Sequence, residues 1–398
     1  FIRVNNILSS THHGFVPNRN TESALFNFMN SLLSQIDNQQ QCAGIYFDLS
    51  KAFDTINYEI LLNKLAKYGM RGQVNQLIKS YLYRRTQQIF LKTTANNIIT
   101  TQKSGVYEDP QGSILGPILF LLYVNDLYEY ISNNIYQFAD DTSCMVSSSS
   151  VPKLSHKTLT TINQMTKYCE QNCLLLNVEK TAILTFKNTG HLQLGDIIIQ
   201  QPNETKFLGL ILDTKFHYRE HIHNLINKIN IASHVIRVLK EELSIETIKQ
   251  FYYAYVQSLV AYGIIFWYAS PDWNKVFVAQ KRVLRTIYNL SARQSCRSFF
   301  RKFDIMTVTS LYMYKLIMYV RRNQSNFTKN GDLYSKMTTR GHTYLSVPKH
   351  RTTCFEKGPY YRAIQIYNTL PLSLINIYEN NRFKREIKKY FINKEYYS

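Results

Sequence analysis

The sequence predicts an α+β fold, in which antiparallel hairpins alternate with amphipathic helices. Apolar runs on both sides of Ala139-Asp140-Asp141 are typical of two strands joined by a tight turn. Apolar residues recur at helical spacing within residues 154–173 and again within 221–240. With 398 residues, 45% of them hydrophobic, the chain can form two or three units that each have a core.

Turn and capping residues place the other expected elements. Asn57 and Gly69 are a typical start and stop for a helix over 58–68. We also expect helices at 72–83, 114–130 and 311–322, strands at 87–92 and 197–199, a hairpin at 207–213 and a flexible polar loop at 323–339.

Acidic residues follow two of the predicted strands. Asp140 and Asp141 are adjacent at the hairpin tip, and Asp48 ends the apolar run 43–47. Adjacent carboxylates repel each other unless a cation lies between them, although a solvated Asp-Asp turn is also common in ordinary loops. Three acids carried by two strands suit two Mg²⁺ ions and phosphoryl transfer.

The charge balance indicates a polyanionic partner. Lys and Arg number 47 against 27 Asp and Glu, which gives a net charge of +20 and a pI near 9.5. Lys281, Arg282 and Arg285 begin a stretch with no acidic residue through Lys302, which suits a duplex backbone or forms a solvated helix face. The 30 Tyr and 22 Phe could stack on bases, though most aromatic residues lie in cores.

Cysteine and hydropathy patterns indicate an intracellular, nuclear or cytoplasmic protein without a membrane partner. The six Cys lack the paired spacing of a zinc site, so we expect reduced thiols. His217, His221 and His223 have no Cys or carboxylate companion at ligand spacing, which disfavours a zinc site there. The longest apolar run, 114–124, contains Gly116 and Pro117 and is too short to cross a bilayer.

Five segments resemble, in order, motifs A to E of reverse transcriptases: YFDLSKAFD, PQGSILGPILF, QFADDT, LNVEKT and KFLGLILD. They are most similar to those of non-LTR (LINE-like) retrotransposons of the jockey group. HHGFVPNRNTESAL resembles that family's fingers, and YGIIFWY, AQKRVLRTI and YNTLP resemble its thumb and C-terminal region. The resemblance therefore covers nearly the whole chain.

The resemblance implies a right-hand polymerase in three parts. Residues 1–215 would form partial fingers and the palm, 216–300 a helical thumb, and 301–398 a basic C-terminal extension. Because the chain opens with Phe1 rather than Met, we expect the start of the fingers and an endonuclease domain to belong upstream.

The implied activity is RNA-directed DNA polymerisation, in which dNTPs are added to the 3′-OH of a DNA primer on an RNA template. Asp48, Asp140 and Asp141 would hold two Mg²⁺ ions, or Mn²⁺ in their place. Lys180 would protonate the leaving pyrophosphate, or is a solvated Lys at a strand entry. Phe53 would be the steric gate beneath the sugar, or a core residue.

Further residues would bind the dNTP. Gln111 and Gly112 lie in the motif resembling PQG, and Arg19 matches a basic position that could touch phosphate, or is an ordinary loop Arg. The family usually has Gly-Val-Pro-Gln-Gly, whereas residues 107–109 here intervene between Val106 and Pro110. That departure puts activity in doubt and supports an alternative, a catalytically decayed nucleic-acid-binding remnant. A two-metal nuclease is a second alternative, but it would have no use for a PQG motif.

Overall fold

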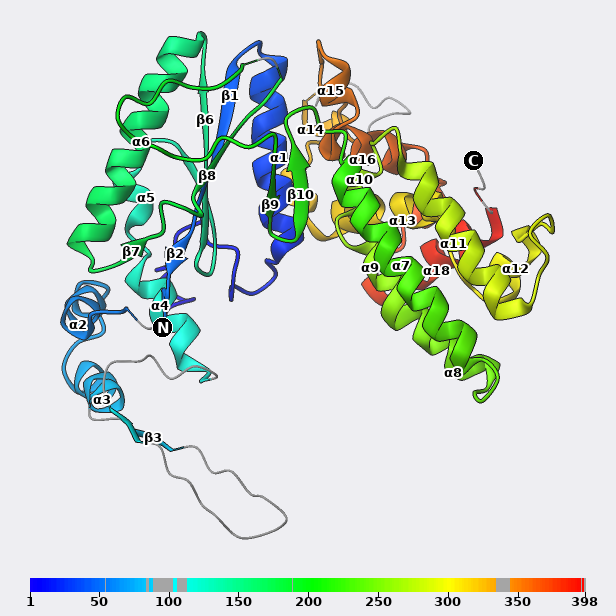
Figure 1. The fold of residues 1–398 in the computed structure, drawn as a ribbon, viewed down its shortest axis with the longest axis horizontal. Helices are drawn as coiled ribbons and strands as arrows, with labels where there is room; N and C mark the ends of the chain where they lie inside the picture. The colour runs from blue at the N-terminus through cyan, green and yellow to red at the C-terminus, as the bar shows by residue number, and fades with distance from the viewer. Residues whose placement is uncertain are drawn as a thin grey trace. The chain divides into compact units, whose positions relative to one another are not determined.

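The chain forms two compact units (Figure 1). The computed structural model describes residues 1–53, 55–83, 86–88, 103–105, 113–187, 189–333, 344–394 and 396. The N-terminal unit comprises Phe1–Phe28 and Gln40–Asn203, and the C-terminal unit comprises Met29–Gln39 and Glu204–Ser398. Strands and helices are mixed, and the named strands of the described residues pair antiparallel, so the predicted α+β class is confirmed.

A four-stranded antiparallel sheet organises the N-terminal unit. Its strand order is β5-β6-β1-β8, with bounds Asn134–Phe138, Asp141–Ser148, Gln41–Phe47 and Ala182–Thr185. Six of the seven residues of β1 are buried, as a strand covered on both faces requires. β1 pairs with β6 so that Phe47 lies opposite Thr142, and that register aligns the ends of the two strands.

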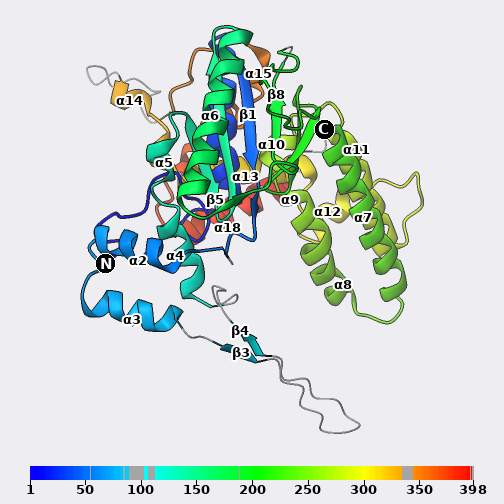
Figure 2. The same ribbon diagram turned by 60° about the vertical axis from the view of Figure 1, so that its left-hand side comes forward.

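Helices surround this sheet and complete its core. α6 packs across β6 and β1, as Figure 2 shows, and buries Leu154, Met165 and Tyr168 completely. The predicted cap of α2 is confirmed, because the Asn57 side chain accepts hydrogen bonds from the first turn. The other elements of this unit are α1 (Thr21–Asp37), which continues into the C-terminal unit, α2 (Tyr58–Lys67), α3 (Gln73–Leu82), α4 (Leu115–Tyr123), α5 (Leu127–Tyr130), α6 (Val151–Gln171), and the short pairs β2 (Leu49–Ser50) with β7 (Leu175–Leu176) and β3 (Thr86–Gln88) with β4 (Lys103–Gly105).

Two predicted elements of this unit were wrong. The single helix expected over 114–130 is broken between α4 and α5, because the Asn125 side chain bonds the backbone of Ile7 and Ser9, both at 2.8 Å. The strand expected at 197–199 is absent from the described fold, where only an isolated bridge joins Gln200 to Ala182. Of the strand expected at 87–92, the part beyond Gln88 lies outside the described residues.

An ion pair between the buried Lys64 and the half-buried Asp126 connects α2 to the segment between α4 and α5. Lys64 Nζ donates to Asp126 Oδ1 at 2.7 Å and to the Tyr123 carbonyl at 2.7 Å. The Tyr168 hydroxyl also donates to Asp126 Oδ1, at 2.6 Å. Burial lowers the pKa of Lys64, and Asp126 counteracts that shift. The pair therefore matters chiefly because neither partner can be removed alone without leaving polar groups unsatisfied.

We expect Asp126→Ala to lower the free energy of unfolding by about 3 kcal/mol, because it leaves the Lys64 ammonium buried without its carboxylate. Replacing both partners, Lys64→Met with Asp126→Leu, should cost less than the single change, since no unpaired charge remains. Urea denaturation measures both losses, with exposed Asp196→Ala as the control. A double variant as unstable as the single one would contradict this account.

The C-terminal unit is a short hairpin followed by helices. β9 (Glu204–Phe207) and β10 (Leu210–Asp213) confirm the hairpin expected at 207–213, and both loop residues, Leu208 and Gly209, have positive φ. α7 packs on α11, and α13 packs on α16 and α18. The helices are α7 (Arg219–Leu239), α8 (Ile245–Phe251), a π-helical turn (Tyr252–Gln257), α9 (Ser258–Ala261), α10 (Ile264–Trp267), α11 (Trp273–Tyr288), α12 (Arg297–Lys302), α13 (Val308–Arg322), a 3₁₀ turn (Gln324–Asn326), α14 (Asn330–Leu333), α15 (Thr353–Glu356), α16 (Pro359–Asn368), α17 (Leu372–Ile375) and α18 (Asn380–Lys394).

The loop expected at 323–339 is therefore wrong in its first half, where a 3₁₀ turn and α14 form, and its remainder lies outside the described residues. Phe327 accounts for part of this order, because its ring is buried and stacks on Tyr360 at 5.2 Å between centroids. A buried aromatic ring within a polar stretch is a tertiary contact that composition does not reveal.

An acidic side chain fixes the last turn of α1 within the C-terminal unit. Asp37 Oδ1 accepts hydrogen bonds from the Thr352 amide and hydroxyl, both at 2.7 Å, and from the Arg351 amide at 3.0 Å. Burial would raise the pKa of Asp37, but the bonds from Thr352 and Arg351 outweigh it and lower the pKa. The carboxylate thus holds the segment that begins α15.

Candidate active site

The β5–β6 hairpin carries two of the predicted acids at its tip. β5 ends at Phe138 and β6 begins at Asp141, so Ala139 and Asp140 form a two-residue loop. Ala139 has φ +55°, as the first loop position of such hairpins requires. Asp140 and Asp141 are both exposed. The fold therefore presents two adjacent carboxylates to solvent at one end of the sheet.

Asp48 lies at the same end of the sheet. Phe47, the last residue of β1, lies opposite Thr142 on β6. Asp48 follows Phe47 and Asp141 precedes Thr142, so both acids lie one residue further toward the same end of the sheet. The Asp48 carbonyl accepts a hydrogen bond from the Asn177 amide at 2.8 Å, which holds the backbone after the strand. The backbone thus brings three acids from separate segments to one edge. Within the described residues, however, no three His, Cys, Asp or Glu side chains gather closely enough to hold a metal ion.

Lys180 is beside this carboxylate edge. Its Nζ lies 4.0 Å from Asp48 Oδ2, and the two side chains are 72% and 38% exposed. An ion pair of that length in solvent contributes little to stability. The ammonium is therefore close to the acids without being fixed to them.

A segment that sequence reasoning did not assign to the site supports the hairpin. Residues 11–14 run beside β5: the Gln137 amide donates to the Thr11 carbonyl at 3.0 Å, and the His13 amide donates to the Gln137 carbonyl at 2.7 Å. At Gly14 a Cβ would lie 2.5 Å from the Ala139 nitrogen, so only glycine fits against the tip. We call residues 11–14 the hairpin brace. The Gly in HHGF was the available signal, but its partner is far away in the sequence.

Arg19 contacts the brace. Its guanidinium donates to the carbonyls of Ser10 at 2.7 Å and His12 at 2.5 Å, and burial lowers its pKa. The structure therefore gives Arg19 a role in holding main chain, while its phosphate contact stays a prediction.

Phe53 follows β2 and packs on α4. Its half-buried ring lies 4.7 Å from the Phe120 ring between centroids, at an angle of 39°. The steric-gate role stays a prediction. Gln111 and Gly112, together with the intervening residues 107–109, lie outside the described residues.

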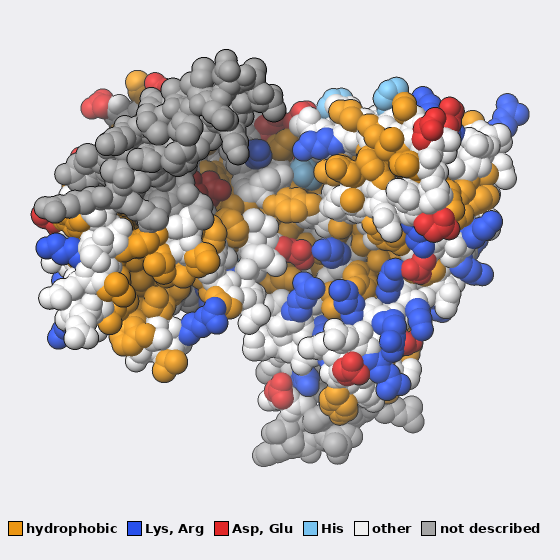
Figure 3. Space-filling view, turned by 90° about the horizontal axis from the view of Figure 1, so that it is seen from below, with side chains coloured by type: hydrophobic (Ala, Val, Ile, Leu, Met, Phe, Trp, Pro, Cys, Tyr) orange, Lys and Arg blue, Asp and Glu red, His pale blue; other side chains and the backbone are white. Residues whose placement is uncertain are grey.

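The excess positive charge lies in the C-terminal part of the sequence. Residues 204–398 hold 31 Lys and Arg against 13 Asp and Glu, whereas residues 1–203 are nearly balanced at 16 against 14. Arg282 is exposed, while Lys281 lies over the Phe277 ring at 4.5 Å and Arg285 donates to the Gln294 carbonyl at 3.2 Å. Figure 3 shows Lys and Arg side chains gathered on the right-hand part of one face. Among the residues that the structure describes, no helix is both long and apolar enough to span a membrane.

We expect Gly14→Ala to lower the free energy of unfolding by about 1–3 kcal/mol, because the added methyl group overlaps the backbone of the hairpin tip. Gly195→Ala is the matched control, since its site is open and only its positive φ opposes the change. Chemical denaturation compares the two variants. A smaller loss for Gly14→Ala than for Gly195→Ala would contradict the proposed packing of the brace.

The brace should also make the unit sensitive to acid. Burial lowers the pKa of both His12 and His13 to about 4, against an ordinary value near 6.5. Between these values the unfolded chain binds protons that the folded chain does not, so stability rises with pH over this window. We expect the free energy of unfolding to fall as the pH drops from about 6.5 to 4, and His12→Gln to reduce the slope. Denaturation at a series of pH values tests this, with exposed His156→Gln as a control that keeps the slope.

Comparisons with known proteins fit this arrangement. A family model described as reverse transcriptase (RNA-dependent DNA polymerase) matches residues 2–212. The chain is similar to the probable RNA-directed DNA polymerase from transposon BS of Drosophila melanogaster, 25% identical over 300 residues that cover 71% of this chain and 33% of that protein. It is also similar to the RNA-directed DNA polymerase from mobile element jockey of the same species, 27% identical over 292 residues that cover 69% and 31%.

The chain therefore spans about a third of the length of the curated relatives it matches. Among solved structures, apo telomerase from Candida tropicalis aligns with a TM-score of 0.39 at 14% identity, over 83% of this chain and 56% of that chain.

Proposed function

The chain belongs to the reverse transcriptase family, and from that premise we propose that it adds deoxynucleotides to a DNA primer on an RNA template, as part of a jockey-like non-LTR retrotransposon protein. The observation that carries the proposal is the alignment of Asp48 with Asp140 and Asp141 at one end of the sheet, within the span that matches the family.

The donor set at this edge suits hard divalent cations. Reverse transcriptases generally use divalent metal ions, and carboxylate oxygens are the ligands that Mg²⁺ and Mn²⁺ prefer. Asp48, Asp140 and Asp141 would hold two such ions. When bound, the ions would activate the primer 3′-OH and neutralise charge on the triphosphate and the leaving group.

The protein's own contribution is to hold like charges together. Asp140 and Asp141 repel each other, so the hairpin would relax if its backbone were free. Hydrogen bonds from the Gln137 amide to the Thr11 carbonyl and from the His13 amide to the Gln137 carbonyl oppose that movement, and so does the close contact of Gly14. The brace therefore keeps the two carboxylates adjacent at the tip of the hairpin, where they could take up cations.

Lys180 is suited to proton transfer at the leaving group. Its ammonium lies at the edge of the acid group, 4.0 Å from Asp48, and is open to solvent. A cation in this position would donate a proton to pyrophosphate as the bond to the α-phosphate breaks.

The nucleotide pocket would be formed by residues around Phe53. Its ring is supported by Phe120, so it could exclude a 2′-OH by shape. Gln111 and Gly112 would contact base and sugar, and Arg19 would reach the phosphates.

The basic C-terminal half would hold the nucleic acid. Its 31 Lys and Arg against 13 Asp and Glu would provide sequence-independent affinity for phosphates, and Lys281, Arg282 and Arg285 would contribute along α11. In this proposal residues 1–215 are partial fingers and palm, 216–300 the thumb and 301–398 an extension.

One observation favours a second candidate, a remnant that binds nucleic acid without synthesis. Residues 107–109 are three extra residues, two of them acidic, immediately before Pro110 and the proposed nucleotide-binding Gln111. Acidic side chains beside a triphosphate pocket would repel the substrate. Binding of primer-template in the absence of turnover distinguishes this candidate.

We expect Mg²⁺-dependent extension of oligo(dT) on poly(rA), and a loss of at least about a hundredfold in Asp140→Ala, because a charge-stabilising ligand is removed. Asp196→Ala is the control, an exposed Asp elsewhere in the same unit, and should retain activity. Binding without extension by the unaltered chain would support the remnant. Degradation of the primer without synthesis would support a nuclease.

A further inference from the structure

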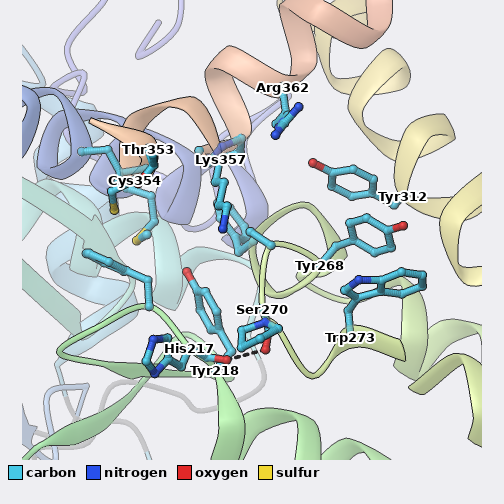
Figure 4. Close-up of a pocket in the computed structure, with 18 of the residues that line it drawn as sticks. His217, Tyr218, Tyr268, Ser270, Trp273, Tyr312, Thr353, Cys354, Lys357 and Arg362 are labelled. Carbon is cyan, nitrogen blue, oxygen red and sulfur yellow. Dashed lines mark hydrogen bonds between the residues drawn. The ribbon is translucent and has the colours of Figure 1, made fainter. Parts of the chain in front are cut away.

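The C-terminal unit contains a cavity of about 810 Å³ that the proposed polymerase activity does not use. It lies between the loop after β10, the loop before α11, helix α13 and the α15–α16 segment (Figure 4). None of the residues proposed for catalysis or dNTP binding lines it. Its size is that of ordinary small-ligand sites.

One wall of the cavity is a row of three aromatic rings. Tyr268 lies between the other two: its ring centroid is 4.0 Å from that of Tyr312, at a stacked angle of 15°, and 4.7 Å from that of Trp273, at a tilted angle of 35°. The Tyr268 hydroxyl bonds Thr309 at 3.1 Å, which fixes the middle ring. Tyr312 is buried, whereas Trp273 is half-buried at the other end of the row. Trp273 is therefore the ring able to accept another planar group.

The polar character of the cavity is cationic. Lys215 and Lys357 are exposed at its margin and Arg362 is half-buried, while no Asp or Glu occurs among the described lining residues. The Arg362 guanidinium lies 3.7 Å from a carboxylate oxygen of Glu356 and donates a hydrogen bond to the side-chain oxygen of Gln365 at 2.9 Å. Figure 4 shows Lys357, which lies between α15 and α16, among the residues that line the cavity. The cavity thus joins a planar apolar surface to the exposed positive charge of Lys215 and Lys357.

We infer that this cavity binds one unpaired nucleotide of a single-stranded nucleic acid, with the base stacked on Trp273 and its phosphate near Lys357 and Lys215. Cations alone would attract any polyanion, but a row of aromatic rings next to them selects an anion that carries a planar ring. A duplex offers no free base face, so the ligand is a single strand or a free nucleotide. This site extends beyond the proposed polymerase activity, which requires no stacked base here.

Tryptophan fluorescence gives a direct readout. The chain has two tryptophans, of which Trp267 is fully buried and donates to the Tyr262 carbonyl, so a ligand-dependent change in emission reports Trp273. We expect a four-nucleotide oligo(dT) to quench the emission of the whole chain, and Trp273→Phe to abolish the quench. Trp273→Ala should weaken binding about tenfold, because the stacking partner is lost.

Two ligand controls identify what is recognised. An abasic oligonucleotide of the same length has the same phosphates and should not quench. Free dTMP tests whether the ligand is a free nucleotide instead of a single strand. We expect dTMP to quench less than the oligonucleotide, and stronger quenching by dTMP would overturn the single-strand assignment.

Two lysine variants test how positive charge contributes to binding. We expect Lys357→Ala to reduce the slope of log affinity against log salt by about 0.7, the value for one phosphate contact with a single strand. Lys384→Ala removes another exposed Lys, on α18, and should leave the quench unchanged. Because Lys357 is exposed, this comparison stands even if Trp273→Ala does not fold.

Two results would overturn the inference. In the first, fluorescence anisotropy shows that oligo(dT) binds but the tryptophan emission does not change. In the second, the abasic strand quenches the emission as strongly as oligo(dT) does. Identical behaviour of Lys357→Ala and Lys384→Ala would also overturn the inference. Asp140→Ala should keep the full quench, so a loss of polymerisation and a loss of this site are separate results.

Discussion

The pairing of β1 with β6 is the constraint on which the rest of the candidate active site depends. It places Phe47 opposite Thr142 and so aligns Asp48 with the hairpin that carries Asp140 and Asp141. Side chains alternate between the two faces of a strand, so a slip of one residue would exchange the side chains that β1 packs on its two covered faces and would separate the acids. Because β1 is buried along nearly its whole length, the hydrophobic core itself enforces the register. Core packing and acid placement are thus a single property of the sheet.

The sequence was informative where signals are local. Asn57 and Gly69 bounded α2, apolar runs predicted the β5–β6 hairpin, and the acids at strand ends indicated a shared edge. It failed where a distant partner decides the structure. Asn125 ends α4 because it bonds Ile7 and Ser9, and Gly14 is required because the hairpin tip packs against it. Neither partner is visible in any window of neighbouring residues, and Gln111 could be assigned only through resemblance.

The two halves of the sequence differ in net charge. Residues 1–203 are nearly neutral, and two groups of their charges have defined places: the carboxylates at the sheet edge and the Lys64–Asp126 pair. Residues 204–398 instead carry a large positive excess spread over many helices. Individually placed charges suit chemistry at a fixed point, whereas a diffuse excess suits attraction to a long polyanion at any register. The aromatic cavity differs from both, since it combines a few cations with a rigid row of rings.

Helix α1 has a consequence for the order in which the chain folds. Its first part belongs to the unit built by residues up to 203, yet its last turn is held by Thr352, 315 residues after Asp37. On the ribosome, where synthesis proceeds at roughly 5–20 residues per second, the carboxylate of Asp37 waits on the order of tens of seconds for its partner. One continuous helix is therefore completed in two stages. Its final turn lacks this partner until Thr352 has been made.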